Sequence, residues 1–159
     1  MSIWYAICDW IPLEMLHWDF MKNALLAMLL CMRADGITDT YVTSGYRSYS
    51  YQSTLYNFYF QTESQGLSEN AYAHFGEAYI EANYLSQNVY ALTPEDAWAV
   101  VQSYSAAPGH SEHQSGLCVD FMTIHMTDLN RTFENTAAFD WLQENACRFG
   151  FILRYPEHL

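Results

Sequence analysis

The sequence predicts an α+β domain in which helices flank a small antiparallel sheet. In several segments apolar residues recur at steps of three and four, which is the period of a helix with one buried face. Short runs rich in β-branched and aromatic residues lie between these segments and predict strands. Long connections separate several of the elements, which favours an antiparallel sheet. The chain of 159 residues, 51% of them hydrophobic, suffices for one domain around a single core.

The first predicted helix follows Pro12 and closes near Gly36. Apolar residues recur at helical steps between these two positions, and glycine suits a C-terminal cap. Ahead of this helix we expect an irregular N-terminal segment at residues 1–12. The domain itself is expected over residues 13–159.

A strand is expected in "TYVTSGYRS", ended by a turn at Gly45. Ser48 can then cap a helix whose apolar face is marked by three residues at helical spacing, namely Tyr51, Leu55 and Phe58.

Residues 62–90 are expected to be helical in part, with Gly66 and Gly76 as interruptions. Thr93 begins a better-defined helix, because it can cap the N-terminus and a proline follows it at the first turn. Two acidic residues then lie at the positive end of the helix dipole. That helix should run to about Ser105.

The segment "GLCVDF" alternates with period two and predicts a strand. Leu117, Val119 and Phe121 fall on one face of it, so Cys118 and Asp120 fall on the other. The last helix is expected from about residue 137 to residue 149. A closing strand follows in "FILRYP".

Composition excludes some classes of partner. The net charge is −12 and only six residues are basic, which argues against nucleic acid because a phosphate backbone demands a cationic surface. The apolar stretch "NALLAMLLCM" is about half a bilayer span, so we expect no transmembrane segment. The N-terminus has no basic region and does not read as a signal peptide. The four cysteines lack a C-x-x-C pair, which favours free thiols over at most two disulfides.

The stretch "PGHSEHQSGLCVD" concentrates groups that bind metals. A tight turn at Gly116 allows the His113 imidazole and the Asp120 carboxylate to meet at one point, and zinc accepts both kinds of ligand. The pair alone is weak evidence for a metal site, and without further context it favours a capped turn that exposes polar groups to solvent. By composition, His110 is an equally available imidazole.

Three segments occur in order: "YVTSGYRSYSYQ", "PGHSEHQSGLCVD" and "FENTAAFDWLQENACRFGFILRYP". Together they closely resemble the VanY-type D-alanyl-D-alanine carboxypeptidases, zinc peptidases that trim bacterial peptidoglycan peptides. The resemblance covers the chain from about Leu13 to Pro156. It implies the Hedgehog/DD-peptidase fold, an α+β fold with a small antiparallel sheet flanked by helices.

The resemblance also implies roles for individual residues. It makes His113 and Asp120 zinc ligands and places Ser111 along the substrate site. It points to Arg47 as a catalytic, electropositive clamp on the substrate carbonyl or carboxylate, with Gln52 nearby. Arginine suits this role because its planar fork pairs with a carboxylate at two points and keeps its charge. The alternative for Arg47 is a surface salt bridge.

The family continues past "RYP" to an EPWH-like motif, whose glutamate is the general base and whose histidine is the third zinc ligand. This chain ends at "RYPEHL". We therefore expect a domain that is incomplete at its C-terminus and impaired in activity. Glu157 and His158 are an alternative source of the two missing groups.

By resemblance, the expected function is zinc-dependent removal of the terminal D-alanine from peptidoglycan stem peptides. The expected cofactor is zinc, the partners are stem peptides, and the protein is a monomer of the cell envelope. Two alternatives remain. One is a catalytically inactive remnant that binds peptidoglycan. The other is a related L,D-carboxypeptidase or dipeptidase that cuts a different bond.

Overall fold

The computed structural model describes residues 3–6, 18–127 and 131–154. It divides the chain into two compact units. The sheet unit consists of Met1–Tyr46 together with Ser115–Leu159, and the helical unit is the single stretch Arg47–Gln114. The prediction of one domain over residues 13–159 stays a prediction, and each unit is described by itself.

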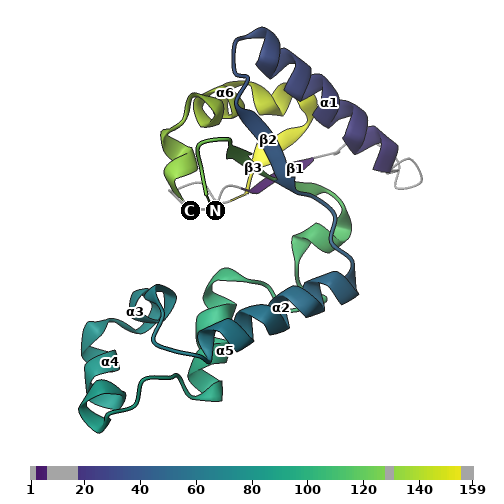
Figure 1. The fold of residues 1–159 in the computed structure, drawn as a ribbon. Coiled ribbons are helices and arrows are strands. Elements are labelled where there is room, and N and C mark those ends of the chain that lie inside the picture. The colour runs from purple at the N-terminus through teal and green to yellow at the C-terminus, as the bar shows by residue number, and fades with distance from the viewer. Residues whose placement is uncertain (1–2, 7–17, 128–130, 155–159) are drawn as a thin grey trace. The chain divides into compact units, whose positions relative to one another are not determined.

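The sheet unit contains a four-stranded antiparallel sheet with the strand order β2-β3-β1-β4 (Figure 1). The α+β class with a small antiparallel sheet is thus confirmed. Strand β3 pairs with β2 on one side and β1 on the other, and all six of its residues are buried. The strands are β1 (Ile3–Ala6), β2 (Thr40–Ser44), β3 (Cys118–Thr123) and β4 (Phe151–Leu153).

The prediction of an irregular segment over residues 1–12 is wrong for residues 3–6, which form β1. This strand pairs with two strands from the far end of the chain, with Tyr5 opposite both Cys118 and Ile152. Four residues carry too short a pattern to predict a strand, and partners so distant in sequence leave no local signal.

In the part of the sheet unit that the structure describes, the α-helices are α1 (Trp18–Ala34) and α6 (Ala137–Asn145). The predicted start of the first helix, at residues 13–17, lies outside the described residues. A 3₁₀ turn, η5 (Ala146–Phe149), extends α6 to Gly150, which has the positive φ of 80° that suits a glycine cap. Another 3₁₀ turn, η4 (Arg131–Asn135), precedes α6.

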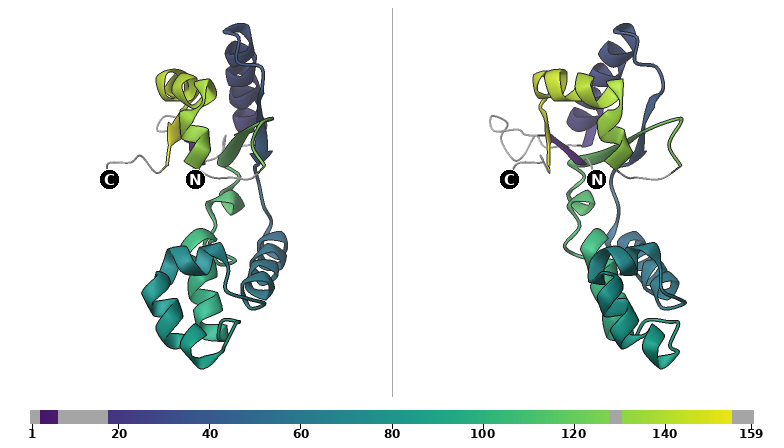
Figure 2. Two further views of the ribbon diagram at one scale, coloured as in Figure 1. Left: turned by 60° about the vertical axis from the view of Figure 1, so that its left-hand side comes forward. Right: turned by 90° about the vertical axis from the view of Figure 1, so that its left-hand side faces the viewer.

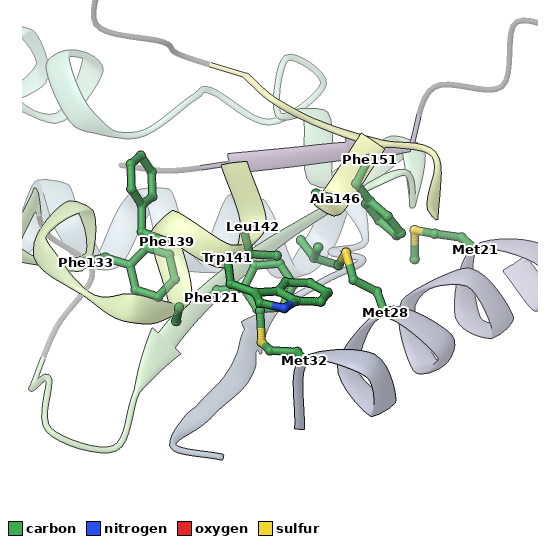
Figure 3. Close-up of a cluster of buried hydrophobic side chains, with 12 residues drawn as sticks. Met21, Met28, Met32, Phe121, Phe133, Phe139, Trp141, Leu142, Ala146 and Phe151 are labelled. Atoms are coloured by element: carbon green, nitrogen blue, oxygen red, sulfur yellow. The ribbon is translucent and has the colours of Figure 1, made fainter. Parts of the chain in front are cut away.

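One apolar core holds the sheet unit together (Figure 3). Three methionines of α1 pack against side chains from β3, α6 and β4, and methionine suits such irregular gaps because its side chain is flexible. The indole nitrogen of Trp141 donates to Asp35 at 2.8 Å and so ties α6 to the end of α1. The largest members of the core are Met21, Met28, Met32, Phe121, Phe133, Phe139, Trp141, Leu142 and Phe151.

In the helical unit, helices begin and end at residues with local capping signals. Side chains of Ser48, Ser68 and Thr93 accept hydrogen bonds from backbone N–H groups at three helix N-termini. Gly76, with a φ of 82°, separates two short helices. The elements are α2 (Tyr49–Glu63), α3 (Glu69–Phe75), α4 (Glu77–Asn83), η2 (Leu85–Gln87) and α5 (Pro94–Tyr104), followed by η3 (Glu112–Ser115) at the boundary.

Aromatic stacking joins α2 to α5, which lie side by side in both views of Figure 2. The Trp98 ring of α5 stacks on Tyr56 at 4.9 Å and on Phe60 at 4.1 Å between ring centroids. A small apolar cluster continues this core toward α3 and α4: Ala71, Ile80, Tyr84, Leu92, Ala97 and Val100.

The apolar face that the sequence marks on α2 is not the face that packs. Tyr51 and Phe58 are 60% and 59% exposed. The helix instead buries Gln52, Tyr56 and Glu63. Two polar side chains therefore lie on the packed face, where hydrogen bonds must satisfy them. Among the described residues, no helix combines the length and apolarity needed to cross a bilayer.

Candidate active site

Arg47 and Gln52 form one hydrogen-bonded assembly at the start of α2. The Arg47 Nη1 donates to the Gln52 Oε1 at 3.1 Å. The Gln52 Nε2 donates in turn to the backbone carbonyl of Ala106 at 2.7 Å. Gln52 is only 1% exposed, so these bonds hold its amide in one orientation. The predicted neighbourhood of Arg47 and Gln52 is present in the structure.

The loop that follows α5 presents Ser111 and His113, both of which are buried. The backbone N–H of Gly109 donates to the Gln114 Oε1 at 2.7 Å, and the Gln114 N–H donates to the Ser111 carbonyl at 3.0 Å. Gly109 has a φ of +91°, a conformation that other residues rarely adopt. These bonds fix the loop shape on which the Ser111 and His113 positions depend.

A backbone hydrogen bond connects the loop to the arginine. The Arg47 N–H donates to the His113 carbonyl at 3.0 Å. The loop also meets α2, because a Cβ built on Gly109 would lie 3.8 Å from the Tyr49 Cε2. Within the helical unit, the first predicted metal ligand therefore lies beside the residue predicted to clamp the substrate.

Asp120, the second predicted metal ligand, belongs to the sheet unit. It lies within β3, opposite Ile3 of β1 and Ser44 of β2. Its neighbours Val119 and Phe121 contribute to the apolar core, as the alternation predicts. Asp120 itself is fully buried rather than solvent-facing. The predicted meeting of its carboxylate with the His113 imidazole stays a prediction.

The two predicted ligands, His113 and Asp120, carry the types of ligand atom that zinc binds. Zinc accepts imidazole nitrogen and carboxylate oxygen, and both candidate ligands are buried ionisable groups, with exposures of 3% for His113 and 0% for Asp120. In the described ranges, however, no three His, Cys, Asp or Glu side chains gather closely enough to hold a metal ion. The resemblance predicts two ligands, His113 and Asp120, and a catalytic zinc takes three from the protein.

Sequence patterns did not predict a buried carboxylate in the same unit, that of Glu63. Its Oε1 accepts from Asn70 at 2.8 Å and from the Tyr104 hydroxyl at 3.0 Å, and its Oε2 accepts from Ser68. Burial raises the pKa of the Tyr104 phenol, and the charge of Glu63 raises it further. This network joins the end of α2 to the start of α3 and to α5. No periodic signal could have found it, because a glutamate in a helix is ordinarily solvent-exposed.

A family model for VanY, described as D-alanyl-D-alanine carboxypeptidase, matches residues 16–159. The D-alanyl-D-alanine carboxypeptidase of Enterococcus faecalis is 44% identical over 66 residues, which are 40% of this chain and 22% of that protein. The chain thus spans about a fifth of the length of this curated relative.

Solved structures give the same assignment. VanYB in complex with D-alanine-D-alanine has a TM-score of 0.54 and 29% identity, over 86% of this chain and 59% of that one. A point mutant of the vancomycin resistance D,D-pentapeptidase VanY, in complex with Zn(II), has the same TM-score and identity over 86% and 60% of the two chains.

The LdcB LD-carboxypeptidase has a TM-score of 0.57 and 27% identity, over 87% of this chain and 50% of that one. These neighbours share a peptidase fold that confirms the predicted class. The family model extends over both the sheet unit and the helical unit. The chain therefore belongs to the VanY family of D-alanyl-D-alanine carboxypeptidases.

Proposed function

We propose that this protein is a zinc-dependent D-alanyl-D-alanine carboxypeptidase that removes the terminal D-alanine of peptidoglycan stem peptides. The observation that carries the proposal is the hydrogen-bonded assembly of Arg47, Gln52 and the His113 backbone. It brings a cation, a buried amide and an imidazole into one region of the helical unit. The neighbour solved with D-alanine-D-alanine and the one solved with Zn(II) support the substrate and the metal.

In this proposal, His113 and Asp120 hold the metal through a neutral imidazole nitrogen and a carboxylate oxygen. A zinc ion held there would supply Lewis-acid chemistry at the scissile carbonyl. A third ligand is required, and the proposal places it outside residues 3–6, 18–127 and 131–154. By the same resemblance, we place the protein in the cell envelope and expect a monomer.

Arg47 would bind and orient the substrate. A stem peptide ends in a carboxylate, and a guanidinium can donate two parallel hydrogen bonds to it. The bond from Nη1 to Gln52 restricts the rotamers of Arg47 before substrate arrives, which lowers the entropy that binding must overcome. Ser111, buried in the neighbouring loop, would line the same site.

The test measures zinc content and free D-alanine for matched pairs of variants. We expect His113→Ala to lose bound zinc and D-alanine release, whereas His125→Ala, at an exposed histidine, should retain both. Asp120→Asn and the exposed Asp140→Asn form the second pair. Wild-type levels of zinc in both His113→Ala and Asp120→Asn would rule out the proposed metal ligands.

A second candidate function is an L,D-carboxypeptidase, which the fold likeness to LdcB supports. The two functions differ in the bond that is cut. A pentapeptide ending in D-Ala-D-Ala and a tetrapeptide ending in a single D-Ala, offered separately, distinguish them. Release from the pentapeptide alone supports the D,D activity, and release from the tetrapeptide alone supports the alternative.

A further inference from the structure

The side of α2 that faces away from the core carries no charge. We call it the outer face of α2. Its two largest side chains, Tyr51 and Phe58, are 60% and 59% exposed. The only charged residue of the helix, Glu63, is buried. The exposed residues of the outer face are Ser50, Tyr51, Thr54, Asn57, Phe58, Gln61 and Thr62. In a chain with a net charge of −12, such a surface requires an explanation other than solubility.

The two aromatic rings are spaced as a pair of platforms. Phe58 lies seven positions after Tyr51, which is about two helical turns, so the rings lie on one side of α2 about 10 Å apart along its axis. That separation is close to the disaccharide repeat of an extended β-1,4-linked glycan, so the two rings can stack on alternate sugars of one strand. Phe58 contacts Tyr59, with ring centroids 6.1 Å apart, and Tyr59 packs edge-on against Tyr104 of α5 at 5.3 Å. These contacts link the Phe58 ring to α5 through the Tyr59 ring.

The polar members of the outer face suit sugar hydroxyls. The Thr54 and Thr62 hydroxyls donate to the backbone carbonyls of Ser50 and Phe58, each at 3.0 Å. Their oxygens can therefore still accept hydrogen bonds from a ligand. The amides of Asn57 and Gln61 offer both donors and acceptors. Aromatic rings stack on the apolar faces of pyranoses, while hydroxyl and amide groups bind the rims of the sugars.

We propose that the outer face of α2 binds an uncharged glycan strand. The outer face belongs to the same helix as part of the candidate active site, because α2 begins two residues after Arg47 and its opposite, packed side carries Gln52. Identifying the glycan as the backbone of peptidoglycan rests on the proposed function. The preference for an uncharged, linear polysaccharide does not.

The probe for the test is a hexamer of β-1,4-linked N-acetylglucosamine, which has no charge and no stem peptide. We expect the full chain to bind it and the double variant Tyr51→Ala/Phe58→Ala to bind it about tenfold more weakly or worse, because each stacked ring contributes on the order of one kcal/mol. Tyr51→Phe keeps the ring and should retain the affinity. Tyr90→Ala is the matched control, since Tyr90 is 65% exposed and lies outside α2.

Titration calorimetry measures the affinities, and urea unfolding verifies that the exposed substitutions leave the fold intact. Absence of hexamer binding, or equal binding by the double variant and wild type, overturns the proposal. So does a change in self-association of the double variant, by sedimentation, without a change in hexamer affinity. Hexamer binding that depends on Tyr51 and Phe58 in a protein that releases no D-alanine supports this proposal while the proposed function fails.

Discussion

Replacement of Gln52 tests whether its buried amide holds Arg47, the predicted substrate clamp, through the hydrogen bonds that the structure describes. Gln52→Leu keeps the approximate volume and removes two hydrogen bonds, one from the Arg47 guanidinium and one to the Ala106 carbonyl. A bond to a charged group contributes about 1.5–3 kcal/mol and a neutral one about 0.5–1.5 kcal/mol. Arg47 is half-buried, so in the variant water can accept the hydrogen bond that its guanidinium no longer donates to Gln52. The free energy of unfolding should fall by about 2 kcal/mol.

Urea denaturation measures this change. With a slope of about 2 kcal/mol per molar urea for a small protein, the midpoint should fall by about 1 M. Gln61→Leu, an exposed glutamine on the same helix, is the matched control and should stay within about 0.5 kcal/mol of wild type.

Gln52→Glu separates the two bonds, because it keeps an acceptor for Arg47 but places a carboxylate oxygen against the Ala106 carbonyl. It should also be destabilised. Midpoints of Gln52→Leu and Gln61→Leu that agree within error, or a Gln52→Glu as stable as wild type, would refute this account of the buried amide.

Three further predictions follow from the described contacts. Glu63→Ala should lower the free energy of unfolding by about 2–3 kcal/mol, because three donors lose a buried acceptor and water can reach them only in part. The exposed Glu81→Ala should change it little, and equal urea midpoints would contradict the network. Folding raises the pKa of Tyr104, so this phenol stabilises the fold below its ordinary pKa of about 10, and that contribution disappears as pH rises through the raised value. Between pH 8 and pH 11 the urea midpoint should therefore fall further for wild type than for Tyr104→Phe. An equal fall in the two proteins would argue against a contribution from the Tyr104 phenol. Trp141→Phe should lower the free energy of unfolding by about 1–2 kcal/mol through loss of the bond to Asp35. Asp35→Asn keeps an acceptor for the indole and should be destabilised less, as measured by thermal unfolding.

Helix boundaries were predictable because short-range chemistry decides them. Ser48 and Thr93 cap α2 and α5 as their sequence positions indicate, and Gly76 and Gly150 interrupt or end helices with positive φ angles. In each case the deciding interaction connects residues within one helical turn. Such signals are legible in a single sequence.

Long-range pairing was not predictable. Strand β1 exists because Ile3–Ala6 finds partners in β3 and β4, and nothing in those four residues specifies either partner. The packed face of α2 was missed for a related reason. Gln52 and Glu63 are buried because distant groups satisfy their hydrogen bonds, whereas periodicity assigns burial by apolarity alone.

The candidate site was predictable from resemblance rather than from spacing. A histidine and an aspartate seven positions apart are common, and only the surrounding motifs single out His113 and Asp120. The structure adds contacts that the motifs do not encode, such as the backbone bond between Arg47 and His113. These added contacts lie within the helical unit, and the roles of the residues that make them are proposals.

The interleaving of the two units has a consequence for the order of folding. Strands β2 and β3 pair with Ser44 opposite Asp120, yet the whole helical unit, residues 47–114, lies between them in sequence. Closing such a loop from a disordered chain is entropically unfavourable, and each halving of the loop saves about 0.6 kcal/mol. If the helical unit forms first, its Arg47–His113 bond already joins the two ends of that unit, which would lower the entropic cost of closing the loop by about 2 kcal/mol. We therefore expect slowed refolding from substitutions that loosen α2 against α5, and mainly faster unfolding from those in the β2–β3 pair.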